Sequence, residues 1–487
     1  TRDGSAVDDD DDDDDGRRPT HGALGLVAAA EAEKEEEEFE STREIVPHPA
    51  KTGAQLRHNR VLYFLLVAQF LINCDYGILA AALVHIRATM QMSWLGIGSL
   101  SSIIYFALSL STVPVGFILQ RWPSSVRQLL VRSLVANGVC SILCGLAPTA
   151  LSLTLLLALD GVCQAVPAVY LPVWVNQFAP PGASTSWMGY LQNAAQLGTI
   201  AGYAATALAM HSSGERLWRI TFAAQGVFIC ACAMGMRTLE DSDLLLADDL
   251  FSPAAVSLAF DASAHATVRL LCRFRRHRAF WFTLYAAGAL YFVGNGLNYW
   301  ASLYLVDELG ARPAAADVLS LLTSFVGPIV GTWAGAWCID YVGGYRKNHE
   351  RALEACFLLS VVPVLLLPAI CLSRSVATIS AALLLMLAFV AALAPALAGI
   401  VLDILPEELR PLASGVYGLG INLLGLGLST FVGGGAIELT GSVAFGWRLN
   451  ALVSCAVPVL LLFARATLGL HTPIRVVLRG MYERRFN

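Results

Sequence analysis

The sequence predicts an all-α membrane protein with twelve transmembrane helices in two six-helix halves, and three observations lead to this fold class. First, hydrophobic residues make up 56% of the 487 residues and charged residues only 14%, whereas roughly a quarter of the residues of soluble proteins are charged. Second, apolar stretches long enough to cross a bilayer recur along the chain. Third, one long polar interruption divides these stretches evenly. This composition, with a mean hydropathy of +0.61, argues against a soluble enzyme.

The apolar stretches lie between Val61 and Leu470 and number twelve. Each supplies the roughly 20 helical residues that cross a hydrocarbon core of about 30 Å. Polar residues, prolines and glycines separate one stretch from the next. We therefore expect transmembrane helices over residues 61–84, 95–120, 126–147, 150–178, 185–210, 217–236, 279–305, 316–340, 352–372, 376–403, 412–438 and 446–470.

The longest polar interruption, Glu240–Arg278, separates the sixth stretch from the seventh and runs from acidic to basic residues. Two six-helix halves joined in this way are typical of secondary transporters. A charged, low-complexity segment with an octa-aspartate run precedes the first stretch, and we expect it to be disordered. The predicted organisation is an acidic tail over 1–58, an N-terminal half over 59–238, a linker over 239–278, a C-terminal half over 279–470 and a basic tail over 471–487.

The distribution of Lys and Arg predicts the orientation of the chain in the membrane. About 22 basic residues lie on the side that carries the two tails and the linker, and about 6 lie on the other side. Because basic residues are retained in the cytosol, we expect both termini to be cytosolic. The sequence leaves open whether the membrane is the plasma membrane or an endolysosomal one.

Chemistry other than transport has little support in the sequence. Most of the eleven cysteines lie within or beside apolar stretches, where they pack as small hydrophobic residues, and they lack His or Cys neighbours at metal-ligand spacing. No nucleophile and base stand in a recognisable arrangement. We therefore expect no enzymatic activity, no metal, no cofactor and no nucleic-acid partner. The expected partners are the lipid bilayer, a small-molecule or lysolipid substrate and protons, with a functional monomer.

Ionisable residues inside the spans are the strongest site candidates, because a charge there costs at least about 2.5–3.5 kcal/mol on insertion scales. Asp75 lies within the first span beside Asn73, and Asp160 and Gln164 share one face of the fourth span at i and i+4. Spans of both halves add amides, which suggests a central cavity that binds the substrate or a coupling ion; hydrogen bonding between helices is the alternative. The added amides are Gln192, Asn193, Gln196, Asn295, Asn298 and Asn422.

The connection after the eighth span carries a recognisable loop pattern. Gly335, Asp340, Gly344, Arg346 and Lys347 resemble the Gly-x-x-x-Asp-x-x-Gly-x-Arg loop of the major facilitator superfamily. Glycines permit a tight turn, and the Asp and the cations can pair across the two halves. The resemblance implies a gating loop at these residues. At the equivalent point after the second span, Gln120 stands where the family usually has Asp, which predicts a weaker N-terminal counterpart.

Further segments resemble the spinster branch of that superfamily, which carries lysophospholipids or sphingoid phosphates. They are Leu159-Asp-Gly-Val-Cys-Gln-Ala, Tyr299-Trp-Ala-Ser-Leu-Tyr-Leu and Ile400-Val-Leu-Asp. The branch usually has an Asp-Arg pair in span 1 and an Arg and a Glu in span 4. Here Tyr76 follows Asp75, and Leu157 and Gln164 occupy the span-4 positions, so the resemblance leaves the coupling ion open.

Together these observations predict a secondary active or facilitative transporter that works by alternating access. A lysolipid-like or sphingolipid-like amphiphile is the substrate class that the resemblance implies. Two alternatives remain at this point: a carrier of a small polar metabolite, and a membrane receptor or sensor that has kept the fold without transport.

Overall fold

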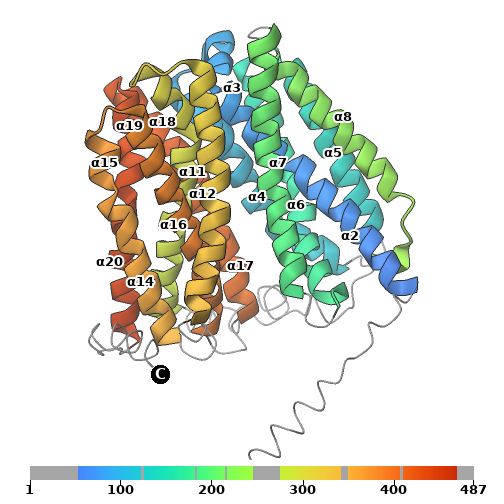
Figure 1. Ribbon diagram of the computed structural model, residues 1–487. Helices are drawn as coiled ribbons and strands as arrows, with labels where there is room; N and C mark the ends of the chain where they lie inside the picture. The colour runs from blue at the N-terminus through green and yellow to red at the C-terminus, as the bar shows by residue number, and fades with distance from the viewer. Residues whose placement is uncertain are drawn as a thin grey trace, which may run out of the picture. The chain divides into compact units, whose positions relative to one another are not determined.

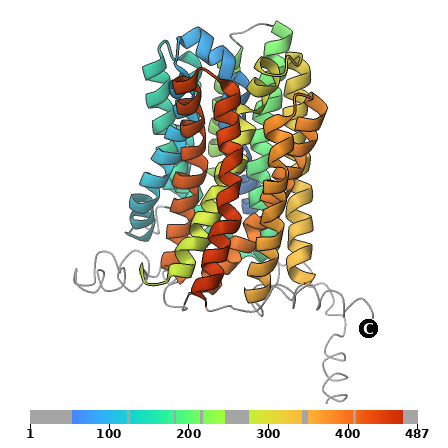
Figure 2. The ribbon, with the colours of Figure 1, turned by 90° about the vertical axis from the view of Figure 1, so that its left-hand side faces the viewer.

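A computed structural model describes residues 53–121, 126–180, 184–213, 217–244, 275–341, 349–405 and 410–468. The chain divides into two compact units, Thr1–Arg57 and His58–Asn487. The predicted tail over 1–58 and the basic tail over 471–487 lie almost entirely outside the described residues, as does most of the linker. All spans belong to the second unit, whose helices Figure 1 and Figure 2 show from two sides.

The N-terminal half consists of the helices that precede the linker. The first span is two helices, α2 (Gly53–Ile72) and α3 (Cys74–Met90), which meet at Asn73. The remaining spans are α4 (Trp94–Arg121), α5 (Val126–Leu146), α6 (Ala150–Phe178), α7 (Ser184–Ser213) and α8 (Trp218–Met236). Buried aliphatic and aromatic side chains of α2, α4, α5, α6 and α8 form one apolar core in this half.

The C-terminal half repeats this plan after the linker. Its first three spans are α11 (Arg278–Asp307), α12 (Pro313–Tyr341) and the pair α14 (His349–Leu365) and α15 (Leu367–Leu372). Next come α16 (Val376–Asp403) and a span built from α17 (Arg410–Gly420), the π-helical turn η4 (Ile421–Gly427) and α18 (Leu428–Thr440). The last span joins α19 (Val443–Leu452), the 3₁₀ turn η5 (Val453–Cys455) and α20 (Ala456–Thr467).

The helical segments coincide with the twelve predicted spans, and the described residues are helical apart from their connections. Ten of the segments are both long and apolar enough to cross a membrane. The other two, α7 and α11, are each 30 residues long but less apolar. Their lower hydropathy has a direct cause, because α7 and α11 carry most of the amides that the sequence singles out. The first span differs from the prediction of one continuous helix, since Asn73 interrupts it.

Glycines let the longest helices approach closely. A Cβ atom on Gly331 of α12 would lie 1.9 Å from the carbonyl oxygen of Ala388 in α16, and one on Gly335 would lie 2.3 Å from that of Ala392. Only glycine fits at such contacts. The glycines spaced four residues apart in α12 therefore serve the packing of α12 on α16.

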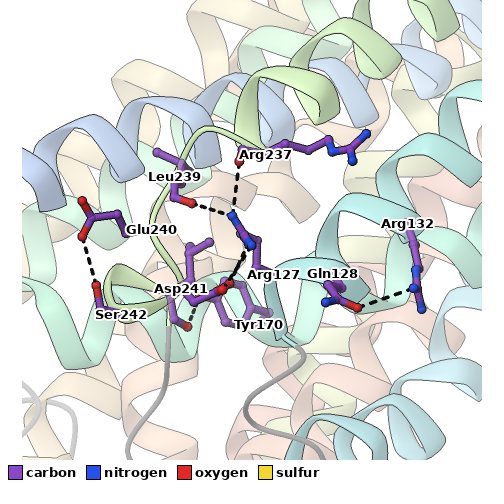
Figure 3. Close-up of polar contacts among 10 residues, drawn as sticks. Arg127, Gln128, Arg132, Tyr170, Arg237, Leu239, Glu240, Asp241 and Ser242 are labelled. Carbon is purple, nitrogen blue, oxygen red and sulfur yellow. Dashed lines mark hydrogen bonds and ion pairs between the residues drawn. The ribbon is translucent and has the colours of Figure 1, made fainter.

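The end of α8 is fixed to α5 by an ion pair (Figure 3). The Arg127 guanidinium donates to the carbonyl oxygen of Leu239 at 2.9 Å and pairs with the Asp241 carboxylate, with Nε 2.6 Å from Oδ1. Tyr170 of α6 donates to the carbonyl of Leu244 at 2.7 Å. The first residues of the linker, including the 3₁₀ turn η2 (Asp241–Asp243), are therefore anchored to the N-terminal half.

Candidate functional site

The break at Asn73 exposes backbone carbonyls in the middle of the N-terminal half. Gln225 of α8 donates to the carbonyl of Leu71 at 2.9 Å, and Thr199 of α7 donates to that of Asn73 at 3.2 Å. Gln164 of α6 lies 3.5 Å from the carbonyl of residue 72. Side chains from three other helices thus satisfy the carbonyls that the interrupted helix cannot, which explains how a break is tolerated at membrane depth.

Asp75 and Asp160 meet across a single amide nitrogen. Nε2 of Gln164 lies 2.7 Å from Oδ2 of Asp75 and 2.8 Å from Oδ2 of Asp160. The other oxygen of Asp160 accepts from Asn137 of α5 at 2.6 Å, and the other oxygen of Asp75 accepts from the backbone N–H of Tyr76 at 2.8 Å. The predicted i, i+4 pair in span 4 therefore joins the predicted acid of span 1 in one network.

Both carboxyls are removed from water, with exposed fractions of 2% for Asp75 and 3% for Asp160. Among the described residues, the ion pairs involve other groups, and no Lys, Arg or His pairs with either carboxyl. Two adjacent buried carboxylates repel each other and lose their hydration, and each uncompensated ion costs several kcal/mol. A proton shared by the pair would remove one of the two charges, so the arrangement is chemically suited to hold a proton.

Tyr76 connects this network to a second aromatic ring. Its hydroxyl donates to Oε1 of Gln164 at 3.2 Å, and its ring stacks on that of Tyr105 in α4 with centroids 4.6 Å apart. Because Tyr76 is only half-buried, it is the member of the network that lies nearest to solvent. In the branch that the sequence resembles, an Arg usually occupies this position; here a neutral phenol occupies it, and among the described residues no cation pairs with the acids.

The predicted amides of α7 lie on a face that points toward the C-terminal half. Gln192, Gln196 and Tyr203 are spaced i, i+4 and i+11, so they share one side of the helix. Tyr203 donates to Asp317 of α12 at 2.8 Å, which fixes that side toward the other half, while Gln192 and Gln196 are exposed. Asn193 is exposed beside them.

A different side of α7 is exposed and entirely apolar. Tyr190, Leu197 and Leu208 share it, and their exposed fractions mark it as the lipid-facing surface. The helix thus carries exposed amides on one side and exposed apolar side chains on another.

The contacts of α4 show where the two halves touch each other. A Cβ atom on Gly98 would touch the backbone of α18, Ser102 hydrogen-bonds Thr430 at 2.8 Å, and the ring of Phe106 lies against Gly427. The next residue on the same face, Leu110, is 79% exposed. The two halves therefore contact each other near the start of α4 and separate further along it.

We call the end of the bundle at which α4 begins the outer end, and the end at which α8 leads into the linker the linker end. The described contacts between the halves lie from the outer end to the level of Phe106. The amides of α7 lie beyond that level, closer to the linker end.

The predicted amides of the C-terminal half have mostly structural partners. Asn295 donates to the carbonyl of Leu426 at 2.8 Å, a group of the π-helical turn η4, and to the Ser429 hydroxyl at 3.0 Å. Asn298 accepts from Ser324 of α12 at 2.8 Å. Hydrogen bonding between helices is the alternative to a cavity-lining role that the sequence left open for these amides. Asn422 lies in η4, half-buried, and its side chain makes no hydrogen bond to another described residue.

The predicted gating loop is only partly described. Gly335 packs against α16, and Asp340 belongs to the last turn of α12. Gly344, Arg346 and Lys347 lie outside the described residues. The role of the loop in gating remains a prediction from the sequence.

The sequence of the chain matches one known protein family. The sequence profile of the Major Facilitator Superfamily matches residues 65–349, which is more than half of the chain. The chain belongs to the Major Facilitator Superfamily. No curated protein matches it.

Solved structures place this superfamily member among transporters of the same fold. A bacterial homologue of the human lysosomal transporter Spinster, in an inward-facing and unoccupied conformation, has a TM-score of 0.63 and 16% identity over 87% of this chain and 98% of its own. A D-xylose–proton symporter has a TM-score of 0.62 and 15% identity over 83% and 96% of the two chains. The nucleoside transporter NupG has a TM-score of 0.60 and 16% identity over 85% and 99%. At these identities the likeness shows the fold alone.

Two features of this superfamily member were missed by reasoning from the sequence. Asn137 contacts Asp160, and its signal was an amide in the middle of the third span. Asp317 lies one turn inside α12 and bonds α7, and its signal was an acid at the start of the predicted eighth span. The rule that flags intramembrane acids applied to Asp317 as much as to Asp75.

Proposed function

We propose that the protein is a proton-coupled secondary transporter in which the pair Asp75–Asp160 holds the coupling proton. The observation that carries this proposal is the shared bond of Gln164 Nε2 to both carboxyls, at 2.7 and 2.8 Å, in a site without a described cation. A proton held by the pair removes one of its two buried negative charges and the repulsion between them. Gain and loss of that proton change the charge of the pair, which can bias the halves between their two arrangements.

The solute path proposed here follows the amide face of α7. Gln192 and Gln196 offer both donors and acceptors, and they carry no charge. The exposed side of α4, which we take as the opposite wall of this path, is apolar and carries Leu110 and Pro114. A solute with a neutral hydrogen-bonding part and an apolar part suits these two walls. This favours an amphiphile of the lysolipid kind over a small polar metabolite, which remains the second candidate because the neighbours of the same fold include carriers named for a nucleoside and for xylose.

The test is flux in proteoliposomes with an imposed pH gradient. The protein is reconstituted with a trapped pH dye and offered lysophospholipids, nucleosides and pentoses in turn. We expect one class to accumulate together with proton entry, and Asp75→Asn and Asp160→Asn to abolish gradient-driven accumulation while exchange between preloaded pools persists. Glu240→Gln, which changes an exposed acid of the linker, is the control and should transport normally.

Other outcomes separate the alternatives. Saturable uptake without any proton movement would identify a facilitative carrier and remove the carboxyl pair from the mechanism. Binding of a solute with no flux in either direction would identify a receptor on the transporter fold.

A further inference from the structure

A third acid of the membrane region, Asp317 of α12, joins the two halves at the outer end. Its Oδ1 accepts from Ser302 of α11 at 2.7 Å and from Tyr203 of α7 at 2.8 Å. Its Oδ2 lies 3.0 Å from Nε2 of His211, also on α7. One carboxylate of the C-terminal half therefore binds two side chains of the N-terminal half.

A second carboxylate crosses between the halves at the same end. Oε2 of Glu438 in α18 accepts from the backbone N–H of Trp94 at the start of α4, at 2.7 Å. The partner in this contact is a backbone amide, which does not titrate. The partners of Asp317 include an imidazole, a group that exists in a neutral and in a positively charged form.

We propose that Asp317 is the centre of an outer latch, formed with Tyr203, His211 and Ser302, that stabilises closure of the outer end and is strengthened when His211 is protonated. The inference rests on the alternating-access function proposed above. A neutral imidazole donates one ordinary hydrogen bond to the carboxylate, whereas an imidazolium adds an ion pair. Acid on the outer side therefore favours the closed outer end, and loss of the proton from His211 weakens the latch.

The surroundings of His211 support a single ionic partner among the described residues. Its side chain is 42% exposed and that of Asp317 is 17% exposed, so the solvent on the outer side reaches the pair. Other titratable groups on neighbouring helices have different contacts: Arg87 of α3 stacks on Trp94, and Arg219 of α8 donates to the carbonyls of Gly145 and Ala147. The further titratable or charged groups of this end are His85, the phenol of Tyr203, Asp307, Glu308, Arg312, Arg374, Glu438 and Arg448. Residues 214–216 lie outside the described part of the chain.

This contact is a means of gating rather than of solute binding. The pair is screened by water, and an exposed pair contributes about 0.2–1 kcal/mol, so the expected shift in the closed-to-open ratio is about 1.4- to five-fold. A shift of that size changes how long the outer end stays closed without locking it. The latch thus makes the return step sensitive to the pH outside.

The experiment measures hydrogen exchange of the outer ends of α7 and α12, with the full chain in lipid nanodiscs and no solute, at about pH 5.5 and about pH 7.5, on either side of the ordinary His pKa. After correction for intrinsic exchange, we expect these segments to exchange about 1.4- to five-fold more slowly at the lower pH. His211→Gln, which keeps a donor without titrating, should abolish the difference. Asp317→Asn should speed exchange at both pH values and should also abolish the difference between them.

Glu438→Gln is the matched control, because it alters a contact between the halves whose partner does not titrate. It should preserve the ratio of the exchange rates measured at the two pH values. If Asp317→Asn does not fold, Tyr203→Phe removes one donor and should raise exchange at both values. If the exchange rates of His211→Gln still differ between the two pH values as in the parent protein, the proposed latch is wrong. Because no solute is present, the result does not depend on the carboxyl pair, and the same ratio in Asp75→Asn separates failure of the latch from failure of proton coupling.

Discussion

Nε2 of Gln164 lies 2.7 Å from Oδ2 of Asp75, although 89 positions separate the two residues in the chain. The same nitrogen bonds Asp160 one helical turn away. A residue that the sequence places on the polar face of the fourth span is thus the bridge between two helices and two acids. This relationship connects the interrupted first helix to the proposed proton site.

Replacing the bridge should affect folding and coupling together. In Gln164→Leu both carboxyls lose a donor inside the protein, and a buried group left without its partner costs about 1–3 kcal/mol. We expect a lower midpoint of thermal unfolding in detergent and loss of gradient-driven uptake. The matched control is Gln196→Leu, an exposed amide on α7. It should leave unfolding unchanged and raise the KM for the solute. Equal stability of the two variants would contradict the bridging role.

Close packing of α12 on α16 predicts that one added methyl group is costly. In Gly331→Ala the new Cβ would meet the carbonyl of Ala388 at 1.9 Å, so the helices must move apart. We expect destabilisation of about 1–3 kcal/mol, seen as a lower yield of monodisperse protein and a lower unfolding midpoint. Gly189→Ala is the comparison, because nothing lies within 4 Å of a Cβ at that position. A similar loss in both variants would mean that helix propensity rather than packing is the cause.

The gating role of Asp340 follows from the loop pattern of the sequence. Replacement by Asn removes the charge that is expected to pair across the halves, so Asp340→Asn should slow flux while insertion and folding stay intact. Initial rates in proteoliposomes and the yield of folded protein are the two measurements. Transport at the parental rate would remove Asp340 from the gate.

The excess of basic residues beside the tails and the linker predicts their side of the membrane. Tags at either terminus should be protected from an added protease in sealed, right-side-out vesicles and be cut after permeabilisation. A tag in the connection between α11 and α12 is the opposite control and should be cut at once. Cleavage of a terminal tag in sealed vesicles would reverse the assignment of outer and linker ends to the two faces.

The positions of the spans were predictable because hydropathy is a local property. A stretch of about 20 apolar residues must become helical in a bilayer whatever its neighbours are, since its backbone has no other partner there. The interruption of the first span was not predicted. Asn73 could end α2 only because Gln225, Thr199 and Gln164 supply the missing donors, and these come from three other helices.

By itself the sequence determined the helical class, the twelve spans, the division into halves and the group of polar residues from which any site must be made. Tertiary structure decided which of those residues act together. Asp75 and Asp160 joined one buried network, Asn295 and Asn298 were taken up by bonds between helices, and Gln192 and Gln196 remained exposed. The physical reason is that the cost of burying a polar group is fixed by its type, whereas the partner that offsets this cost is chosen by which helices pack side by side.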